Sequence, residues 1–401
     1  MTRILFCVVP EKGHVNPCIG PAQHLRAAGF DVAFYAPADI SDQLDGAGTF
    51  TFLGPRETPE RHDLSRGATF AANIRDAAWL RQWIRTLLID LAPAQTDGIR
   101  AVMHAWRPDV VVIDPLLYAA AIAAELEGLP WVAMSNSLNP VLPDDLDSEL
   151  LRTVRWLAPE RDRLFARYGL DARFRGCDIL SPHLTLAFTT EELVGKPPVG
   201  VELVGPALPS GPRGDETSFP WERIDADRPL VYMSLGSQLY YHPDLFAKVI
   251  DATRKTSAQL VLSAGELVDA DVLPTDDERV IAVRYAPQLA LLQRTHAFIS
   301  HGGANSVMEA LASGVPMLLS PFCNDQFHSA HFVERAGAGY RLDLEHATVQ
   351  DIADAIGRAL RPGPLHDRVA QIRASYTRDG SAEAARLISE LASGSRLATG
   401  S

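Results

Sequence analysis

The chain has 401 residues, and its 37 Lys and Arg against 50 Asp and Glu give a formal net charge of −13. Such an acidic chain is poorly suited to nucleic acid or to an anionic membrane surface, so we expect neither as a partner. At roughly 100–200 residues per domain the length predicts two domains, and 47% hydrophobic with 22% charged residues is typical of a globular protein with a sizeable core.

The chain has four cysteines, none in a C-x-x-C pair or at a metal-like spacing: Cys7, Cys18, Cys177 and Cys323. This pattern favours reduced thiols. No secretory signal is recognisable, because proline and charged residues follow the apolar run at residues 4–9 directly. The longest apolar region, residues 110–124, is interrupted by Asp114 and is too short to span a bilayer. We therefore expect a soluble cytoplasmic protein without a membrane span.

The N-terminal region has the pattern of a βαβ unit. Residues 3–9 form a continuous apolar run, which predicts a strand buried on both faces, and residues 31–35 predict the next strand. Between them, we expect Asn16 to be the N-cap of a helix with Pro17 at its first position, and Gly29 to end that helix. This order predicts a parallel sheet with right-handed crossovers. No G-x-G-x-x-G follows the first strand, so a dinucleotide site loses its main support.

A histidine and an aspartate each follow a predicted strand. His14 lies in the predicted loop at residues 10–15, and Asp114 ends an apolar strand at residues 107–113. Ligands of open α/β sheets bind at the carboxyl ends of the strands. If the two strands are near neighbours, Asp114 can accept from one ring nitrogen of His14, which leaves the other nitrogen free to act as a base. Alternatively, His14 is structural and Asp114 is a turn or N-cap aspartate before Pro115.

The composition changes at residues 194–229, which are rich in proline and glycine and typical of a surface linker. A strand is predicted beyond it at residues 230–234, and a glycine–serine turn containing Ser237 follows. Further predicted strands at residues 259–262 and 280–284 alternate with helical stretches. This alternation predicts a second doubly wound sheet.

Residues 297–314 predict an anion site. A short apolar strand leads into His301 and two glycines, where the backbone can approach a ligand closely. Asn305 and Ser306 then open a helix that Gly314 ends. Unpaired N–H groups and the helix dipole favour a negative charge at this N-terminus, and phosphate is the obvious candidate.

A second buried strand is predicted at residues 315–320, followed by a loop at residues 321–326. This loop ends in three polar side chains, Asn324, Asp325 and Gln326. They follow the strand next to the anion site, and their carboxylate and amide groups suit the hydroxyl groups of a ligand.

These segments resemble the nucleotide-sugar signature of the family 1 glycosyltransferases, which include plant natural-product and bacterial antibiotic glycosyltransferases. The matching pieces occur in the same order: Ala286-Pro287-Gln288, His301-Gly302-Gly303, Asn305-Ser306, Glu309, Gly314-Val315-Pro316 and Asp325-Gln326. Tyr285 departs from the pattern, because many members carry a tryptophan that stacks on the base at this position. Near the N-terminus, G-H-V-N-P resembles the G-H-x-x-P segment that carries the family's catalytic histidine, and Asp114 matches its partner aspartate.

The resemblance implies an α/β protein of the GT-B fold, with two Rossmann-like, doubly wound parallel-sheet domains that face each other across a cleft. The expected boundaries are an N-terminal acceptor-binding domain at residues 1–205, a linker at 206–228, a C-terminal nucleotide-sugar-binding domain at 229–380, and a final segment at 381–401. We expect the helix of that final segment to cross back onto the N-terminal domain.

The resemblance also implies roles for single residues. His14 is the expected catalytic base and Asp114 its partner. The expected donor-binding residues are Ser237, Tyr285, Ala286, Gln288, His301, Gly303, Asn305, Ser306, Glu309, Asp325 and Gln326. Among these, the resemblance places Ser237 and His301 at the diphosphate and Glu309 at the ribose hydroxyls. It places Asp325 and Gln326 at the sugar hydroxyls.

Two of these residues have structural alternatives. His301 could merely terminate its strand. Ser306 and Glu309 form an S-x-x-E pattern, which is a capping box and a sufficient structural reason for both residues. By contrast, no turn motif in the sequence explains Asp325 and Gln326.

Two D-x-D strings could hold a divalent metal on a diphosphate, at residues 225–227 and 269–271. Both lie in charged, loop-like surroundings, and no H-E-x-x-H or histidine cluster occurs. We therefore expect no metal and no cofactor, the nucleotide sugar being a co-substrate.

Aromatic residues lie among polar ones at residues 50–100 and 135–195, where the family builds most of its acceptor pocket. An aromatic-lined, fairly apolar acceptor site is implied. Trp79 and Trp83 also have the i, i+4 spacing of ordinary helix packing, so the two interpretations stay open for each aromatic residue.

The sequence as a whole predicts an inverting, metal-independent glycosyltransferase. The expected donor is a UDP- or TDP-hexose with glucose-like hydroxyls, and the expected acceptor is a small, largely apolar secondary metabolite. The alternatives are a nucleotide-sugar 2-epimerase and a non-catalytic helper of another glycosyltransferase. An oligomer is possible under each of them.

Overall fold

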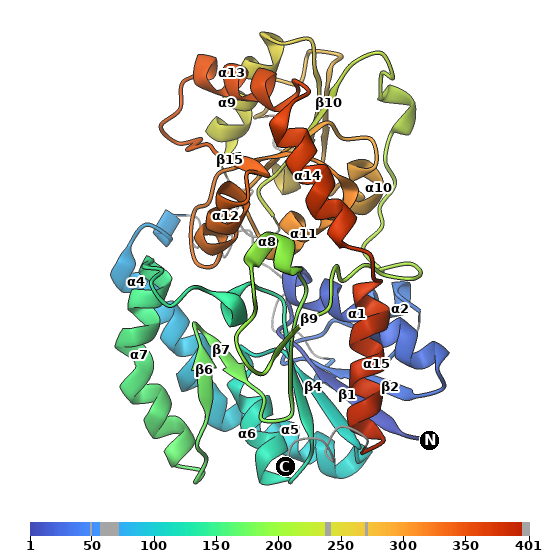
Figure 1. Cartoon of the computed structure of the whole chain (residues 1–401), viewed down its shortest axis with the longest axis vertical. Coiled ribbons are helices and arrows are strands. Elements are labelled where there is room, and N and C mark those ends of the chain that lie inside the picture. The colour runs from blue at the N-terminus through green and yellow to red at the C-terminus, as the bar shows by residue number, and fades with distance from the viewer. Residues whose placement is uncertain (49, 57–71, 237–241, 269–271, 395–401) are drawn as a thin grey trace. The chain divides into compact units, whose positions relative to one another are not determined.

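The computed structural model describes residues 1–48, 50–56, 72–236, 242–268 and 272–394. The chain divides into two compact units. Unit 1 comprises Met1–Arg61, Asp76–Asp215 and Thr377–Ser401, and unit 2 comprises His62–Arg75 and Glu216–Tyr376. Each unit contains a parallel sheet with helices, so the predicted α/β fold class is confirmed (Figure 1). Among the described residues, no helix is both long and apolar enough to cross a membrane.

Unit 1 is built on a seven-stranded sheet with the order β3-β2-β1-β4-β5-β8-β9, in which neighbouring strands are parallel. The strands are β1 (Arg3–Cys7), β2 (Asp31–Tyr35), β3 (Thr51–Phe52), β4 (Val110–Ile113), β5 (Trp131–Ser135), β8 (Leu184–Ala187) and β9 (Val201–Leu203). A separate antiparallel hairpin joins β6 (Arg173–Arg175) and β7 (Asp178–Leu180). From β1 the chain adds β2 and β3 on one side, and from β4 it continues on the other side. The strand order therefore reverses between β1 and β4.

The helices of unit 1 are α1 (Lys12–Ala27), α2 (Ser41–Gly46), α4 (Ala77–Arg85), α5 (Ala92–Trp106), α6 (Tyr118–Leu126), α7 (Glu149–Ala166), α8 (Glu191–Val194) and α15 (Gly380–Ala392). A π-helical turn, Thr86–Asp90, separates α4 from α5. The sheet is buried on both faces, since all four residues of β4 are buried. The alanine-rich α6 is buried over most of its length and packs on α5. This burial explains why the strands have continuous apolar sequences.

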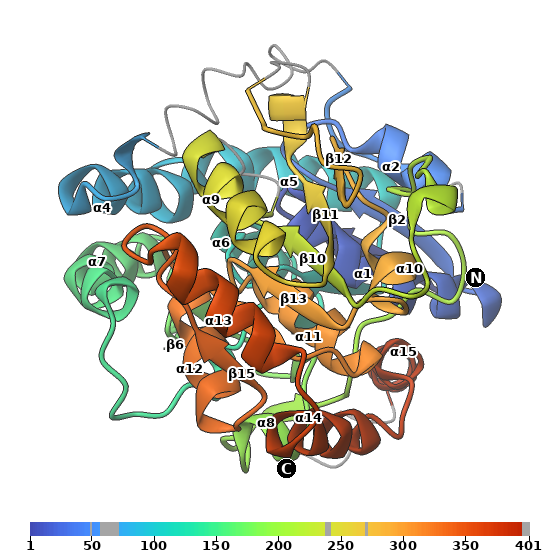
Figure 2. The ribbon, with the colours of Figure 1, turned by 90° about the horizontal axis from the view of Figure 1, so that it is seen from above.

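Unit 2 is built on a six-stranded parallel sheet with the order β12-β11-β10-β13-β14-β15. The strands are β10 (Leu230–Ser234), β11 (Gln259–Ser263), β12 (Val280–Val283), β13 (Ala297–Ser300), β14 (Met317–Leu319) and β15 (Gly339–Arg341). The helices are α9 (Pro243–Arg254), α10 (Gln288–Leu292), α11 (Ala304–Ser313), α12 (Gln326–Arg335), α13 (Val349–Ala359) and α14 (Pro364–Ser375), and α9 lies beside α13 (Figure 2). Here the strand order reverses between β10 and β13.

The predicted strands at residues 31–35, 230–234 and 297–300 coincide with β2, β10 and β13. The predicted start of the first helix is wrong. Glu11 is extended and its carbonyl accepts from the N–H groups of both His14 and Val15, so the predicted loop is wound into the first turn of α1. Pro17 consequently lies inside the helix rather than at its first position. His14 thus stands on a helix directly after β1.

The C-terminal helix α15 belongs to unit 1 and packs along α1 (Figure 1). Gly20 of α1 allows this approach, because a β-carbon there would overlap the Ser381 hydroxyl and the Leu208 carbonyl. Ser381 is fully buried, and its hydroxyl donates to Leu208 at 2.6 Å. One glycine therefore lets α1, α15 and the segment that follows β9 pack together.

We predict opposite effects for the same substitution at two helical glycines. Gly20→Ala is expected to destabilise the protein by about 1–3 kcal/mol, because the new methyl group must displace the backbone at Leu208. Gly357→Ala, where a β-carbon meets nothing within 4 Å, is expected to stabilise helix α13 by about 0.5–1 kcal/mol. Thermal unfolding of the two variants measures both effects. Equal shifts in the unfolding midpoint would contradict the packing argument.

Candidate active site

In unit 1, His14 and Asp114 are in contact, as the sequence predicts. His14 lies in the first turn of α1, which follows β1, and Asp114 follows β4, the neighbour of β1 in the sheet. His14 Nδ1 lies 2.5 Å from Asp114 Oδ2. The Asp114 side chain is 1% exposed and that of His14 is 19% exposed. The pair therefore joins a buried carboxylate to an imidazole that still reaches the surface.

Asp114 also has the turn function considered as its structural alternative. Its Oδ1 accepts from the Leu116 N–H at 3.0 Å, and its own N–H donates to the Cys7 carbonyl at 2.9 Å. These bonds fix the backbone and one carboxylate oxygen, so the second oxygen faces His14. The turn role and the contact with His14 are compatible, because each uses a different oxygen atom.

A third residue of this cluster, Asn136, was missed by the sequence analysis. It follows β5, which pairs with β4 on the side away from β1. Its Nδ2 lies 3.0 Å from Asp114 Oδ2 and 2.5 Å from His14 Nδ1. The sequence contained a usable signal, since Asn136 directly follows an apolar strand in the same way as Asp114.

The chemistry of the cluster follows from the ring nitrogens. When Nδ1–H donates to the Asp114 carboxylate, the lone pair of His14 lies on Nε2. This atom can remove a proton from a hydroxyl group, and the buried carboxylate then stabilises the imidazolium. The geometry suits general base catalysis at the edge of the sheet where β1, β4 and β5 end.

In unit 2, two matching serine turns surround His301. Ser234 ends β10 and Ser300 ends β13, and these residues are paired in the sheet. Each serine hydroxyl accepts the N–H of the residue two positions later, Gly236 in one turn and Gly302 in the other, and both glycines have positive φ angles. The serine hydroxyls thus shape the two turns at the point where the strand order reverses.

The His301 imidazole fits between two glycines. A β-carbon on Gly236 would lie 2.7 Å from Nε2, and one on Gly303 would lie 2.6 Å from the same atom. Burial lowers the pKa of His301 to about 4, so the ring is neutral at pH 7. Nδ1 is buried and has no hydrogen-bond partner. A neutral imidazole has one N–H, which donates to the Ser234 backbone or, in the other tautomer, can donate to an anion at this turn. Ser237, the expected second contact to phosphate, lies outside the described residues.

Helix α11 begins one turn earlier than the S-x-x-E pattern predicts. Its N-cap is Gly303, which has no side-chain cap, and the helix starts at Ala304. Ser306 is consequently the third helical residue, and the capping box with Glu309 is wrong. Asn305 and Ser306 lie in the first turn, where backbone N–H groups lack helical partners and favour an anion. Gly314, in the left-handed conformation, ends the helix as predicted.

Glu309 is instead held by Gln288, whose Nε2 donates to Glu309 Oε2 at 2.7 Å and lies 3.3 Å from the Ser306 hydroxyl. The Tyr232 hydroxyl donates to Gln288 Oε1 at 3.2 Å. Glu309 is 3% exposed. The network therefore links three expected donor-binding residues, the buried Glu309 and the partly exposed Gln288 and Ser306.

Two expected residues precede this network. Tyr285 is partly exposed, and its carbonyl accepts from the Thr217 hydroxyl at 2.9 Å. Ala286 is almost fully buried. The side chain of Ala286 therefore serves packing.

The loop after β14 gives Gln326 a structural role that the sequence did not suggest. Gln326 Oε1 accepts from the N–H groups of Phe322 at 2.9 Å and Cys323 at 3.3 Å. Asn324 has a φ of 52°, a left-handed conformation uncommon outside glycine, and its Oδ1 is buried without a hydrogen-bond partner. Asp325 is the N-cap of α12 by position, but its side chain makes no cap hydrogen bond. The side-chain oxygen of Gln326 is therefore bonded to the backbone of its own loop.

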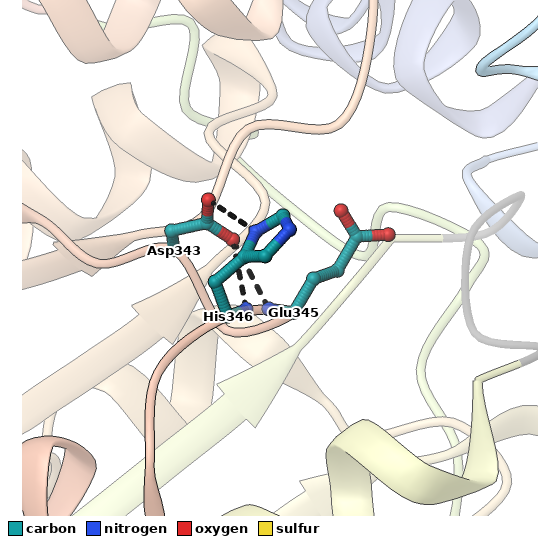
Figure 3. A group of neighbouring side chains, drawn as sticks. All are labelled: Asp343, Glu345 and His346. Carbon is teal, nitrogen blue, oxygen red and sulfur yellow. Dashed lines mark hydrogen bonds and ion pairs between the residues drawn. The ribbon is translucent and has the colours of Figure 1, made fainter.

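Within the described part of the chain, one group of side chains has metal-like proximity: Asp343, Glu345 and His346 (Figure 3). Asp343 Oδ1 accepts from the backbone N–H groups of Glu345 and His346, and Oδ2 lies 2.9 Å from His346 Nδ1. Glu345 forms an ion pair with Arg75. These partners identify an ordinary aspartate turn.

The D-x-D string at residues 225–227 is also accounted for by local structure. Asp225 accepts from the N–H of Asp227 at 2.9 Å and from Arg228 Nε at 3.0 Å. The second string, at residues 269–271, lies outside the described residues.

Comparison with known proteins places this chain among glycosyltransferases. Residues 208–370 match the family described as UDP-glucoronosyl and UDP-glucosyl transferase, and residues 23–177 match the N-terminal domain described as erythromycin biosynthesis protein CIII-like. The oleandomycin glycosyltransferase of Streptomyces antibioticus is 28% identical, with 94% of this chain and 88% of that protein covered. The 4′-demethylrebeccamycin synthase of Lentzea aerocolonigenes is 25% identical, with 97% and 99% covered.

The solved structures agree in fold. A spinosyn rhamnosyltransferase has a TM-score of 0.74 at 20% identity, covering 96% of this chain and 99% of that chain. The same enzyme complexed with thymidine diphosphate has a TM-score of 0.72 at 20% identity, covering 97% and 100%.

We predict that His328 makes unit 2 sensitive to acid. This residue of α12 is 1% exposed, and burial, followed by the charge of His331, lowers its pKa from 6.5 to about 4. Between these pH values the unfolded chain binds a proton that the folded chain does not, so stability falls as the pH falls from 7 towards 4. His328→Gln is therefore expected to lose less thermal stability than the wild type between pH 7 and pH 5. The exposed His183→Gln serves as control and should match the wild type. Equal losses in all three proteins would refute the assignment.

Proposed function

The chain belongs to the family 1 glycosyltransferases with the GT-B fold, and from this premise we propose the reaction that it catalyses. It transfers a hexose from a UDP- or TDP-sugar to a hydroxyl of a small, largely apolar natural product, with inversion at the anomeric carbon and without a metal ion. The alternative functions, a nucleotide-sugar 2-epimerase and a non-catalytic helper, become outcomes of the test below.

The observation that carries the proposal is the 2.5 Å contact between His14 Nδ1 and the buried Asp114 carboxylate. In the proposed step, His14 Nε2 takes the proton of the acceptor hydroxyl as the oxygen attacks the anomeric carbon. The bond between that carbon and the diphosphate oxygen breaks, and its electron pair leaves with the nucleoside diphosphate. Attack opposite the leaving group inverts the anomeric configuration. The imidazolium that forms is stabilised by Asp114.

The negative charge that develops on the leaving diphosphate must be stabilised. The N-terminus of α11 supplies backbone N–H groups, and the neutral His301 supplies an N–H donor beside them. Ser237 completes the proposed set as the family resemblance implies. Fixed dipoles of this kind replace a metal ion, and the carboxylate of Asp225 is already bonded to Arg228.

Three further residues are assigned to the base, the ribose and the sugar of the donor. We assign Tyr285 to stacking on the base. We assign Glu309 to the ribose hydroxyls, so its carboxylate must accept from the ribose as well as from Gln288. Asp325, which is partly exposed, accepts from hydroxyls of the sugar as the family resemblance implies, and this favours a well-hydroxylated hexose. Solved structures of similar fold with bound thymidine diphosphate support a TDP donor, and the match to the family described as UDP-glucoronosyl and UDP-glucosyl transferase supports a UDP donor.

The acceptor assignment rests on the relatives and on unit 1. The relatives include an oleandomycin glycosyltransferase and an aclacinomycin-T 2-deoxy-L-fucose transferase, whose names indicate natural-product acceptors. In this chain, Trp79 and Trp83 of α4 are partly buried against the core of unit 1. Their inner surfaces pack as ordinary helix residues, and the remaining exposed surface suits an apolar acceptor.

The test measures release of nucleoside diphosphate from a panel of UDP- and TDP-sugars, with mixed phenolic and macrolide acceptors and EDTA present. We expect acceptor-dependent release in the wild type that falls about 10²–10⁴-fold in His14→Ala, the usual contribution of a general base. The matched control His183→Ala changes an exposed histidine at the start of β8, at the edge of the sheet opposite His14, and should retain full activity.

Other outcomes count against the proposal. Conversion of the donor without an acceptor supports an epimerase. Donor binding without turnover on the whole panel supports a helper. Activity that EDTA abolishes and a divalent metal restores overturns the metal-free step.

A second prediction concerns the diphosphate site. Gly303→Ala places a methyl group 2.6 Å from His301 Nε2, which must move the ring, although the φ of −59° at Gly303 suits alanine. We expect affinity for UDP and TDP to fall about 10-fold, the equivalent of one lost hydrogen bond to a charged group. Gly357→Ala, in open space on α13, is the matched control. Unchanged affinity in Gly303→Ala, measured by calorimetry, would exclude His301 from the diphosphate site.

A further inference from the structure

Three neighbouring strands of unit 1 end at one cluster of polar side chains. β1, β4 and β5 are consecutive in the sheet, and His14, Asp114 and Asn136 follow them in that order. Asn136 Nδ2 lies 3.0 Å from Asp114 Oδ2 and 2.5 Å from His14 Nδ1. Asn136 therefore contacts both members of the pair to which the proposed function assigns the chemistry.

The hydrogen bonds fix the orientation of the Asn136 amide. An ionised carboxylate only accepts, and Asp114 Oδ2 already faces the imidazole. An amide turned with its oxygen towards Asp114 would set two acceptor atoms against each other. With Nδ2 facing Asp114, both carboxylate oxygens accept hydrogen bonds. Oδ1 accepts from the Leu116 N–H, and Oδ2 accepts from His14 Nδ1–H and from Asn136 Nδ2–H.

The same contacts couple Asn136 to the tautomer of His14. With the proton on Nδ1, the imidazole donates to Asp114 and the lone pair on Nε2 can act as the base. Nδ1 and Asn136 Nδ2 are then both donors and do not bond to each other, so Asn136 donates to Asp114 Oδ2 alone. With the proton on Nε2, Nδ1 accepts from Asn136 and the base is lost. A bond to a buried carboxylate is stronger than a bond between neutral groups, so the Nδ1–H tautomer prevails as long as the Asp114 oxygen stays in place.

We propose that Asn136 is a positioning residue for the transfer reaction, which holds Asp114 Oδ2 against His14 Nδ1 and so keeps His14 in the tautomer with a basic Nε2. This inference rests on the proposed function, because it names a residue that acts through His14. Without the amide, Oδ2 is held by the imidazole alone, and the partly exposed ring can leave it. Asn136 touches neither substrate in this account, and its effect reaches the reaction only through the histidine.

The first experiment compares Asn136→Ala with the wild type in steady-state transfer. We expect kcat to fall about 10-fold to 100-fold, the rate equivalent of one hydrogen bond to a charged group, while KM for donor and acceptor stays within about twofold. In a His14→Ala background the same substitution is expected to have no further effect on the residual rate. An unchanged kcat, or losses that add in the double variant, would overturn the inference.

The second experiment needs no turnover. The protein is labelled with 15N-histidine, and the His14 ring signals are identified among the 12 histidines by their absence in His14→Gln. The wild type is expected to show the pattern of an Nδ1–H imidazole, and Asn136→Ala a mixture of tautomers. Identical ring signals in the two proteins overturn the inference.

The isosteric variant Asn136→Asp controls for a loss of activity that is caused only by misfolding of Asn136→Ala. It retains the shape of the amide but replaces its donor by a second carboxylate, and it should lower kcat at least as much as Asn136→Ala. Transfer at the wild-type rate would overturn the inference. The proposed function fails separately, when the wild type transfers no sugar or when His14→Ala matches it. The ring signals test the role of Asn136 in either case.

Discussion

The reversal of strand order in each parallel sheet is the constraint on which both clusters depend. At the reversal, the connections that follow two adjacent strands run to opposite sides, which leaves an opening at the carboxyl ends of those strands. In unit 1 the reversal lies between β1 and β4, and His14 and Asp114 follow those two strands. In unit 2 it lies between β10 and β13, and Gly236 and His301 follow those. The topology, rather than any one side chain, therefore determines where a ligand can be bound in each unit.

A second constraint is the cost of burying charge. Asp114 and Glu309 are each 3% exposed, and each accepts a hydrogen bond from a side-chain amide, Asn136 in unit 1 and Gln288 in unit 2. A buried carboxylate without donors is expensive, and a neutral amide supplies a donor without adding a charge that would compete with a ligand. Both units solve the same electrostatic problem with the same pair of residue types.

The sequence was most informative where one physical rule acted alone. Continuous apolar runs predicted β2, β10 and β13 to the residue, because strands buried on both faces need apolar side chains throughout. Local helix rules failed at α1 and α11. A proline and an S-x-x-E pattern each indicated a later start, but the backbone had already turned at Glu11 and at Gly303. In both cases the turn at the end of the strand determines the first helical residue, and the capping preferences of later residues do not.

The site was predictable to the extent that its residues follow strands directly. The contact between His14 and Asp114 could be anticipated from the order of strands. The partners of Gln326 and Glu309 could not, because the first depends on how a loop folds back on itself and the second on how α10 packs against α11.

The proposed diphosphate site must act in a protein of net charge −13. In the proposal the attraction for the anion is local, made from N–H groups at the start of α11 and from an imidazole that burial keeps neutral. Such groups create a favourable potential over a few ångströms only, so the anion gains nothing until it reaches the turn between β13 and α11. Overall charge therefore limits which partners approach the protein, and strand-end geometry determines which of them it can bind.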